Sequence, residues 1–261
     1  MNVNPSPSIG KIPQVTFTFW VIKIAATTLG ETGGDAVTMS MNLGYLVGSL
    51  IFGLLAIIAI AVQIRAHRFN PFLYWSVIIA TTTVGTTLAD FADRSLGIGY
   101  AGGASLLSLL LFVSLGLWYW SEGSVSMNLL GSRKAELFYW VTILCSQTLG
   151  TALGDFLADS EGFGYLKGAG VFGAAILVLW ALSLFTHVSR TVLFWGAFIL
   201  TRPLGATVGD LLDKPHSLGG LELDRYWATG ILATFIVACI VIFPRQAGGH
   251  PGGAVKGSAT D

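Results

Sequence analysis

The chain has 261 residues, of which 53% are hydrophobic and only 11% charged, and its formal net charge is zero. About a quarter of the residues of an ordinary water-soluble domain are charged, so this composition argues against a protein that has water as its main solvent. With no net charge and no basic stretch containing aromatic residues, nucleic acid is not an expected partner. Nothing alternates at period two, which excludes a β-barrel.

Four copies of one pattern follow one another along the chain. In each copy a tryptophan stands ten residues before a glycine, and an aspartate stands five residues after that glycine. The copies read Trp20, Gly30 and Asp35, then Trp75, Gly85 and Asp90, then Trp140, Gly150 and Asp155, and finally Trp195, Gly205 and Asp210. The aspartate spacings of 55, 65 and 55 residues indicate that a two-copy ancestor was itself duplicated.

Each copy is predicted to form a helical hairpin, with the repeats at about 16–66, 71–120, 136–187 and 191–244. The first helix carries the tryptophan, glycine and aspartate, and the second helix is the apolar segment that follows. At 1.5 Å per residue, these segments are long enough to cross about 30 Å of hydrocarbon. We therefore predict an all-α membrane protein with eight transmembrane helices in a single integral membrane domain, residues 1–261. The first segment is interrupted by charged residues and makes a poor cleavable signal peptide, so we keep it as a span.

The repeats are predicted to enter the membrane in the same orientation, because each contributes two crossings. This favours parallel repeats with pseudo-symmetry about the membrane normal. Lysine and arginine are more frequent in the loops between repeats than in the loops within them, which predicts that both termini are cytoplasmic. The glycine-rich tail, 246–261, is expected to be a disordered cytoplasmic segment.

The glycines of the predicted helices are expected to have a packing role. Glycines spaced four apart let a neighbouring helix approach closely, so we expect packing roles for Gly30, Gly34, Gly85, Gly150, Gly154, Gly205 and Gly209. The alternative is that these glycines break the helix and expose carbonyl groups to an ion.

Aromatic residues often lie at the membrane interface. We therefore expect two sets of residues to be interface anchors: the tryptophans Trp20, Trp75, Trp140 and Trp195, and the tyrosines of three Gly-Tyr pairs, Tyr45, Tyr100 and Tyr165. The fourth copy carries a six-residue insertion there, which moves its tyrosine to Tyr226.

The repeated aspartates are the candidate functional residues. Asp35 lies about 22 Å along its helix from Trp20, in the outer part of the bilayer. Four ionised, unpaired carboxylates there would cost roughly 10 to 14 kcal/mol. Protonation, a basic side chain or a bound cation must offset this cost. Glu31 shares a helical face with Asp35. Further acids toward the outer mouth are expected to be accessory: Asp93, Asp159 and Asp213.

Lys23 and Arg202 are the only basic residues that the sequence places within the membrane zone, so we expect a shortage of internal counter-charge. Each is either a structural counter-ion or a gating partner. Thr28, Thr83 and Thr148 precede the repeat glycines and are expected to bond the carbonyl one turn back, or else to line a polar path. The alternative for the aspartates is structural, with the carboxylates capping or pinning helices.

Four tandem two-helix repeats, each with a fixed tryptophan and a Gly-to-Asp core, resemble a bacterial membrane-protein family catalogued as a repeat of unknown function, domain number 347. The resemblance covers nearly the whole chain. It implies a multi-pass protein of the bacterial inner membrane, and it implies no activity. The inserted outer loop and Pro203 of the fourth copy depart from strict fourfold equivalence.

The sequence favours a transporter or channel for a small, divalent cation of the Mn²⁺, Mg²⁺ or Ca²⁺ class, with proton exchange as one form of coupling. The predicted metal ligands are Asp35, Asp90, Asp155 and Asp210, because oxygen ligands suit hard cations. No other cofactor is expected, and the predicted partners are the lipid bilayer and the cation. Two alternatives are an intramembrane enzyme with an aspartate dyad, for which no catalytic motif is present, and a structural or sensory membrane module.

Overall fold

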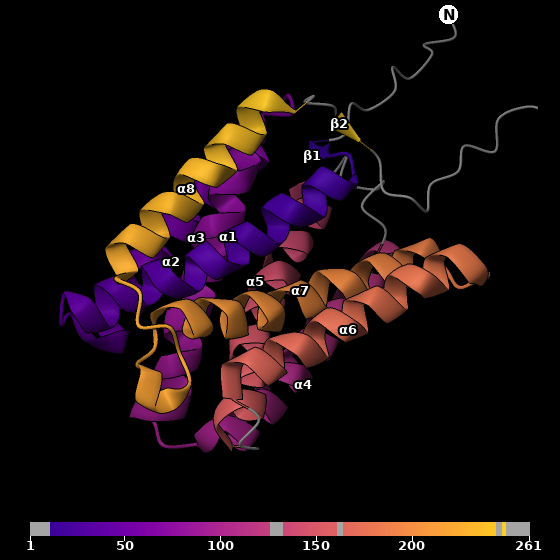
Figure 1. Ribbon diagram of the computed structural model, residues 1–261. Coiled ribbons are helices and arrows are strands. Elements are labelled where there is room, and N and C mark those ends of the chain that lie inside the picture. The colour runs from indigo at the N-terminus through magenta and orange to yellow at the C-terminus, as the bar shows by residue number, and fades with distance from the viewer. Residues whose placement is uncertain (1–10, 126–132, 161–163, 244–246, 249–261) are drawn as a thin grey trace, which may run out of the picture.

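The computed structural model describes residues 11–125, 133–160, 164–243 and 247–248, and it is built almost wholly of helices (Figure 1). The helices are α1 (Phe17–Asp35), α2 (Gly44–Arg65), α3 (Pro71–Asp90), α4 (Gly99–Glu122), α5 (Arg133–Asp155), α6 (Gly164–Phe185), α7 (Arg190–Asp213) and α8 (Arg225–Ile242). Two short strands, β1 (Ile12–Pro13) and β2 (Ala247–Gly248), pair antiparallel. Apart from β2, the predicted disordered tail lies outside the described residues.

Local chemistry explains where the helices begin. The side chains of Thr16, Asn70 and Asp224 accept hydrogen bonds from backbone amides in the first turns of α1, α3 and α8. Gly44 and Gly99 start α2 and α4 with φ of 76° and 69°, a left-handed conformation that glycine adopts without strain. The Gly-Tyr pair of the repeat therefore marks the turn into the second helix.

The first helix of each of the first three repeats continues into a π-helical turn directly after its aspartate. These turns are η1 (Ala36–Ser40), η2 (Phe91–Ser95) and η4 (Phe156–Ser160). The fourth repeat differs, because α7 runs on to Asp213 and is followed by a loop that contains the short 3₁₀ helix η5 (His216–Leu218). The six-residue insertion seen in the sequence forms this loop.

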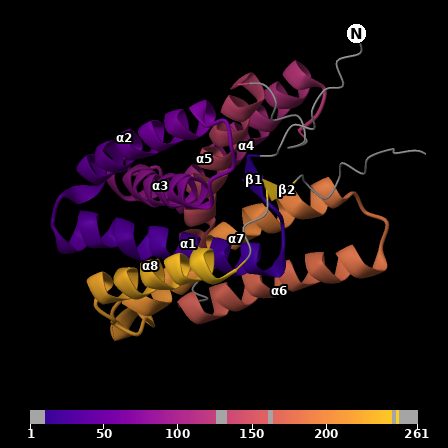
Figure 2. The same cartoon turned by 90° about the horizontal axis from the view of Figure 1, so that it is seen from above.

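The eight helices form a closed inner ring and an outer set of helices packed on it. Helices α1, α3, α5 and α7 pack in that order, and α7 packs against α1, so that they form an inner ring. Each second helix packs against the first helix of the next repeat, α2 on α3, α4 on α5, α6 on α7 and α8 on α1. Figures 1 and 2 show the last two of these pairs, α6 beside α7 and α8 beside α1. This closed order is what parallel repeats around one axis produce.

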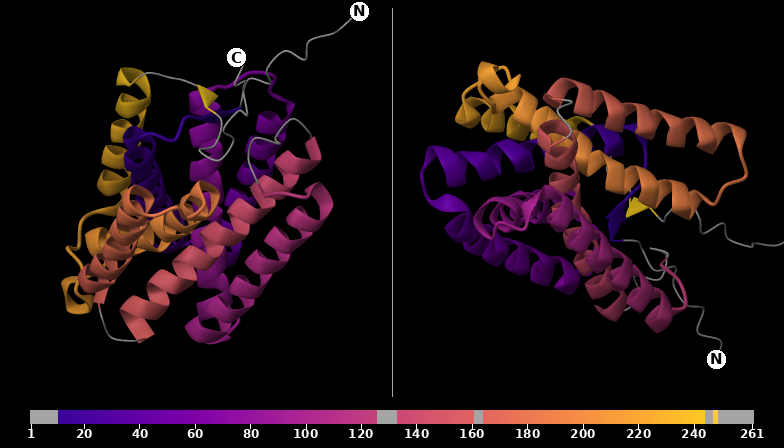
Figure 3. Two further views of the ribbon diagram at one scale, coloured as in Figure 1. Left: turned by 90° about the vertical axis from the view of Figure 1, so that its right-hand side faces the viewer. Right: turned by 90° about the horizontal axis from the view of Figure 1, so that it is seen from below.

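The outward surface of the second helices is apolar. Side chains such as Leu50, Phe112 and Leu177 are more than half exposed. Seven described helices, all but α1, are long and apolar enough to cross a membrane, whereas α1 carries the charged residues Lys23 and Glu31 in addition to Asp35. An apolar surface of this extent would be unfavourable in water, which indicates a multi-pass membrane protein. Figure 3 shows the bundle from two further sides.

Candidate functional site

The first layer of the ring, at the start of its helices, is aromatic. Each aromatic residue that precedes a repeat tryptophan packs on the tryptophan of the next ring helix: Phe19 on Trp75, Tyr74 on Trp140, Tyr139 on Trp195 and Phe194 on Trp20, with ring centroids 5.4, 5.9, 6.3 and 5.6 Å apart. Three of these tryptophans are buried, and Trp20 is partly buried. The prediction that the tryptophans anchor the membrane interface is therefore wrong for Trp75, Trp140 and Trp195, because their rings fill the space between helices.

The second layer consists of the repeat glycines. Gly30 faces Thr82, Gly85 faces Gln147, Gly150 faces Arg202 and Gly205 faces Thr27, and each partner lies three residues before the glycine of its own repeat. At Gly85 an added Cβ would lie 3.0 Å from backbone atoms of Gln147 and Thr148. Gly34, Gly154 and Gly209 likewise face the neighbouring ring helix. These contacts fit the packing interpretation, and the glycines lie within continuous helices.

The hydroxyl groups before the glycines bond their own helices. Thr28, Thr83 and Thr148 donate to the carbonyl oxygens of Ile24, Ile79 and Leu144, at 3.0, 2.8 and 2.9 Å. Each bond joins residues four apart. These threonines therefore satisfy carbonyls one turn back, as the first of the two interpretations had it.

A buried ion pair fills the centre of the ring. Both terminal nitrogens of Arg202 on α7 lie 3.0 Å from Oε2 of Glu31 on α1. The same guanidinium donates to the hydroxyls of Thr86 on α3 and Thr151 on α5, at 2.5 Å each. Arg202 thus contacts all three other ring helices. It is completely buried, and no charged side chain is present at its position in the other repeats.

Lys23 lies on α1 between Trp20 of the aromatic layer and Glu31 of the central ion pair. Its ammonium donates to Oε1 of Gln147 at 3.4 Å and lies 4.2 Å from the ring centroid of Phe198. The side chain is completely buried. Lys23 and Arg202 were both predicted as counter-ions or gating partners, and of the two only Arg202 contacts an acid among the described residues.

The aspartates form a layer at the C-terminal ends of the ring helices, and two basic side chains link them in pairs. Nε of Arg94 lies 3.2 Å from Asp90, and one of its terminal nitrogens lies 3.5 Å from Asp155. Lys214 contacts Asp35 and lies 3.1 Å from Asp210. The expectation that Lys23 and Arg202 are the only basic residues within the membrane zone therefore missed Arg94 and Lys214, which contact the aspartates.

A spacing in the sequence could have identified Arg94 and Lys214 as partners of the aspartates. Arg94 and Lys214 each stand four residues after the aspartate of their own repeat, so they lie on the same helical side one turn beyond it. In the second and fourth repeats the aspartate, a second aspartate and the base form the same five-residue pattern, from Asp90 to Arg94 and from Asp210 to Lys214. The first and third repeats lack the base. The ring is therefore pseudo-twofold in its charges.

Accessory acids lie next to this layer. Arg225, at the start of α8, donates to Asp213 at 3.0 Å and to the hydroxyl of Ser40 at 3.3 Å. Asp93 is buried, and neither of its carboxylate oxygens has a hydrogen-bond partner among the described residues. The side chain of Asp159 lies outside the described part of the structure.

We call the six buried carboxylates at this end the acid belt: Asp35, Asp90, Asp93, Asp155, Asp210 and Asp213. The basic side chains in contact with the belt are Arg94, Lys214 and Arg225. Within the described residues the acids thus outnumber the bases by two to one. Burial would lower the pKa of Lys214, which follows the last residue of α7, but Asp210, Asp35 and Asp213 raise its pKa well above the usual value.

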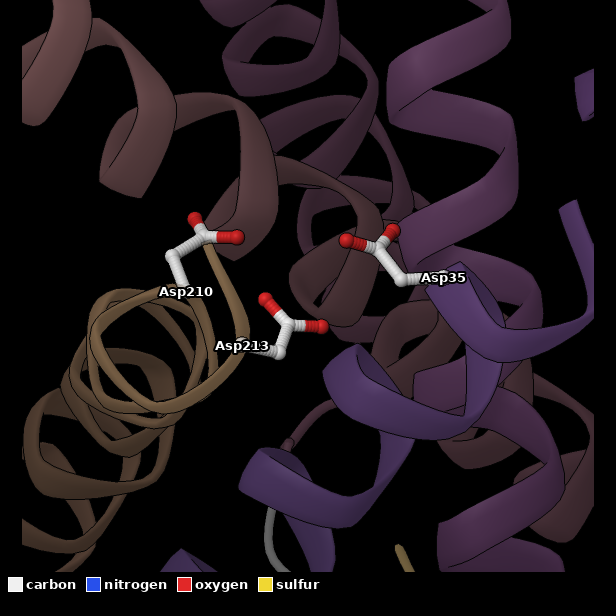
Figure 4. Close-up of side chains that lie close together, drawn as sticks. All are labelled: Asp35, Asp210 and Asp213. Atoms are coloured by element: carbon white, nitrogen blue, oxygen red, sulfur yellow. The ribbon is translucent and has the colours of Figure 1, made fainter. Parts of the chain in front are cut away.

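Three carboxylates of the belt converge between α7 and α1. One oxygen from each of Asp35, Asp210 and Asp213 can be chosen so that all three lie within 4.8 Å of one another. Figure 4 shows the three side chains directed toward a common space. Metal–oxygen distances of about 2.3 to 2.6 Å would allow one ion to contact oxygens so spaced. Of the four predicted metal ligands, Asp35 and Asp210 belong to this group, whereas Asp90 and Asp155 meet at Arg94.

A cavity of about 650 Å³ opens at the same end of the ring. Arg94, Lys214 and Arg225, which contact the acid belt, line this cavity. Tyr100 and Tyr165 also face this cavity, and Tyr45 accepts a hydrogen bond from Arg94 at 3.0 Å. We call this space the outer cavity. Its remaining walls are Met39, Ala158, Gly164, Pro215, Ser217 and Leu218.

A comparison with known protein families identifies the same four repeats. The family described as Repeat of Unknown Function (DUF347) matches the chain four times, over residues 18–69, 73–124, 138–189 and 193–247. This protein belongs to the DUF347 family. Each match covers one ring helix and the outer helix that follows it, so one DUF347 repeat is one helical hairpin. No curated protein and no solved structure matches the chain.

Proposed function

We propose that this DUF347 protein binds a small cation at the acid belt and moves it across the membrane. The observation that carries the proposal is the excess of six buried carboxylates over three basic side chains beside the outer cavity. Uncompensated carboxylates are costly in a low-dielectric environment, and a cation from solution offsets that cost. The outer cavity supplies the entry.

A divalent cation suits the belt better than a monovalent one. Asp35, Asp210 and Asp213 offer oxygen ligands from two ring helices, and the hard ions Mg²⁺, Mn²⁺ and Ca²⁺ bind to such oxygens. The substrate class is therefore a divalent metal cation, and Asp90 and Asp155, which contact Arg94, add negative charge beside the site.

The closed interior favours a carrier over an open channel. Below the acid belt, the ion pair of Arg202 and Glu31 crosses the ring, and the aromatic layer fills the opposite end. An ion could pass only after these contacts rearrange. Such a protein would alternate between outward and inward access, and the open outer cavity supports an outward state here.

The membrane arrangement belongs to the same proposal. We infer that α1 is the eighth span, since it packs within the ring between α3 and α7 and its charged residues are buried there. The basic loops place both termini in the cytoplasm, and the proposed location is the bacterial inner membrane. The outer cavity then faces the extracytoplasmic side.

Ion flux into proteoliposomes tests the proposal. We expect Mn²⁺ uptake by the wild type and at least a tenfold lower rate after Asp210→Asn or Asp35→Asn. The matched control is Asp224→Asn at the exposed start of α8, because asparagine caps a helix about as well as aspartate does. Unchanged flux after replacement of Asp35, Asp90, Asp155 and Asp210 together would refute the role assigned to them.

One observation favours a structural module as the second candidate. Arg94 and Lys214 each connect aspartates of two neighbouring ring helices, so the charges also hold the ring together. If that were their only role, the Asp→Asn variants would unfold at lower temperature and no flux would be detected in the wild type. The intramembrane enzyme with an aspartate dyad predicts instead that only two of the four repeat aspartates matter.

A further inference from the structure

The two basic links of the acid belt occupy equivalent positions but differ in the chemistry of their side chains. Arg94 contacts Asp90, Asp155 and the hydroxyl of Tyr45. A guanidinium is a planar fork that can hold several acceptors at once, so these contacts fix its orientation. Arg94 therefore bridges α3 and α5 through several acceptors at once.

Lys214 is a point charge on a flexible four-carbon chain. Its ammonium lies against Asp35 and Asp210, and the residue also lines the outer cavity. Arg94 also lines this cavity, but the flexible chain of Lys214 can move into it without breaking the several directed contacts that hold a guanidinium.

The oxygens around Lys214 are not saturated. Oδ1 of Asp35 and Oδ1 of Asp213 are buried and have no hydrogen-bond partner within the described residues. Asp35 is completely buried. Buried carboxylate oxygens normally have partners, so these atoms retain the capacity to bind a further cation.

The local charge balance identifies the kind of cation. Asp35, Asp210 and Asp213 face Lys214 and Arg225, so the group carries one net negative charge when all five side chains are ionised. A divalent ion in place of the ammonium would neutralise the group, whereas a monovalent ion would leave its charge unchanged.

We propose that Lys214 is a tethered competitor, which a divalent cation from the outer cavity displaces from Asp35 and Asp210. The ion takes Asp213 as its third carboxylate, and the displaced ammonium moves into the cavity. Arg94 stays between Asp90 and Asp155, so one half of the belt exchanges its cation and the other half remains clamped. This inference rests on the proposed function and assigns the exchange to one residue.

Binding of Mn²⁺ to the purified full-length protein in detergent, measured by calorimetry, tests the inference. Lys214→Gln removes the competitor and should tighten Mn²⁺ binding at least tenfold. Lys214→Arg introduces a fork that holds both carboxylates and should weaken binding at least tenfold. The control Lys167→Gln removes the same charge from an exposed position near the outer end of α6 and should change affinity less than threefold.

The outcomes separate the two proposals. If the wild type binds Mn²⁺ and Lys214→Gln binds it with the same or lower affinity, displacement of Lys214 is wrong while the cation site stands. If neither the wild type nor Lys214→Gln binds Mn²⁺, although both show cooperative thermal unfolding, the inference and the proposed divalent substrate are both wrong. Tighter binding by Lys167→Gln equal to that of Lys214→Gln would show a general charge effect and also overturn the inference.

Discussion

Arg202 and Glu31 meet at the centre of the ring, with both terminal nitrogens of the arginine 3.0 Å from the same carboxylate oxygen. The two residues are 171 positions apart and come from the last and first ring helices. Neither has an ionisable equivalent in the other repeats. This contact therefore closes the ring between its two ends and breaks its fourfold equivalence.

Breaking this pair should destabilise the protein strongly. Glu31→Gln leaves the Arg202 guanidinium buried without a counter-charge, which costs about 3 to 5 kcal/mol, and Arg202→Met leaves the carboxylate in the same condition. The double variant removes both charges, so its loss should be much smaller than the sum of the two single losses. Thermal unfolding in detergent measures all three.

The pair of Lys134, which is exposed, and Glu122, which is partly buried, at 3.6 Å, is the control for this cycle. Lys134→Met should cost less than about 1 kcal/mol, because exposed ion pairs contribute little. Additive losses in the Glu31 and Arg202 cycle would contradict a direct interaction between them.

The glycine layer predicts a difference between two glycine substitutions. In Gly85→Ala, the new methyl group would lie 3.0 Å from backbone atoms of Gln147 and Thr148, so α3 and α5 must separate. We expect a loss of about 1 to 3 kcal/mol, as for other overpacked interiors. Gly170→Ala on α6 meets no atom within 4 Å and should be neutral or stabilising. Equal stability of the two variants in an unfolding assay would contradict the close approach of α3 and α5.

The aromatic layer predicts that tryptophans contribute unequally to stability. Trp75 is 3% exposed and packs on Phe19, so Trp75→Ala should cost about 3 to 5 kcal/mol. Trp180 on α6 is 62% exposed, and Trp180→Ala should cost much less. Unfolding by heat in detergent compares them. A repeat tryptophan that served only as an interface anchor would instead resemble Trp180.

The proposed orientation can be tested with single cysteines in a chain whose Cys145 and Cys239 have been replaced by serine. Ser217→Cys, in the wall of the outer cavity, should react with a membrane-impermeant maleimide added to intact cells. His67→Cys, exposed in the loop between the first two repeats, should react only after the cells are opened. The reverse pattern would place the outer cavity in the cytoplasm.

Much of the architecture could be predicted because it depends on the spacing of residues that are close together in the sequence. The Trp, Gly and Asp register is periodic, and each Gly-Tyr pair marks the turn into the second helix of its hairpin. The seven apolar segments could also be read directly, since length and hydropathy are properties of contiguous residues. The acid positions of the site follow from the same register.

The partners of those acids could not be read in this way. Lys214 contacts Asp35 although the two are 179 residues apart, and that contact exists only because α7 packs against α1 to close the ring. The base four residues after Asp90 and Asp210 was visible, but its position suggested an outer loop rather than the belt. The tryptophans were misjudged for the same reason, since helix packing decides whether an aromatic side chain faces lipid or another ring.

The sequence by itself determined the repeat, the helical hairpins and the concentration of acids at one end of the ring helices, because each depends on residues close together in the chain. Only the tertiary structure decided which charges meet and which residues share the outer cavity. Electrostatic and packing energies depend on distance in space, and ring closure brings together residues from opposite ends of the chain.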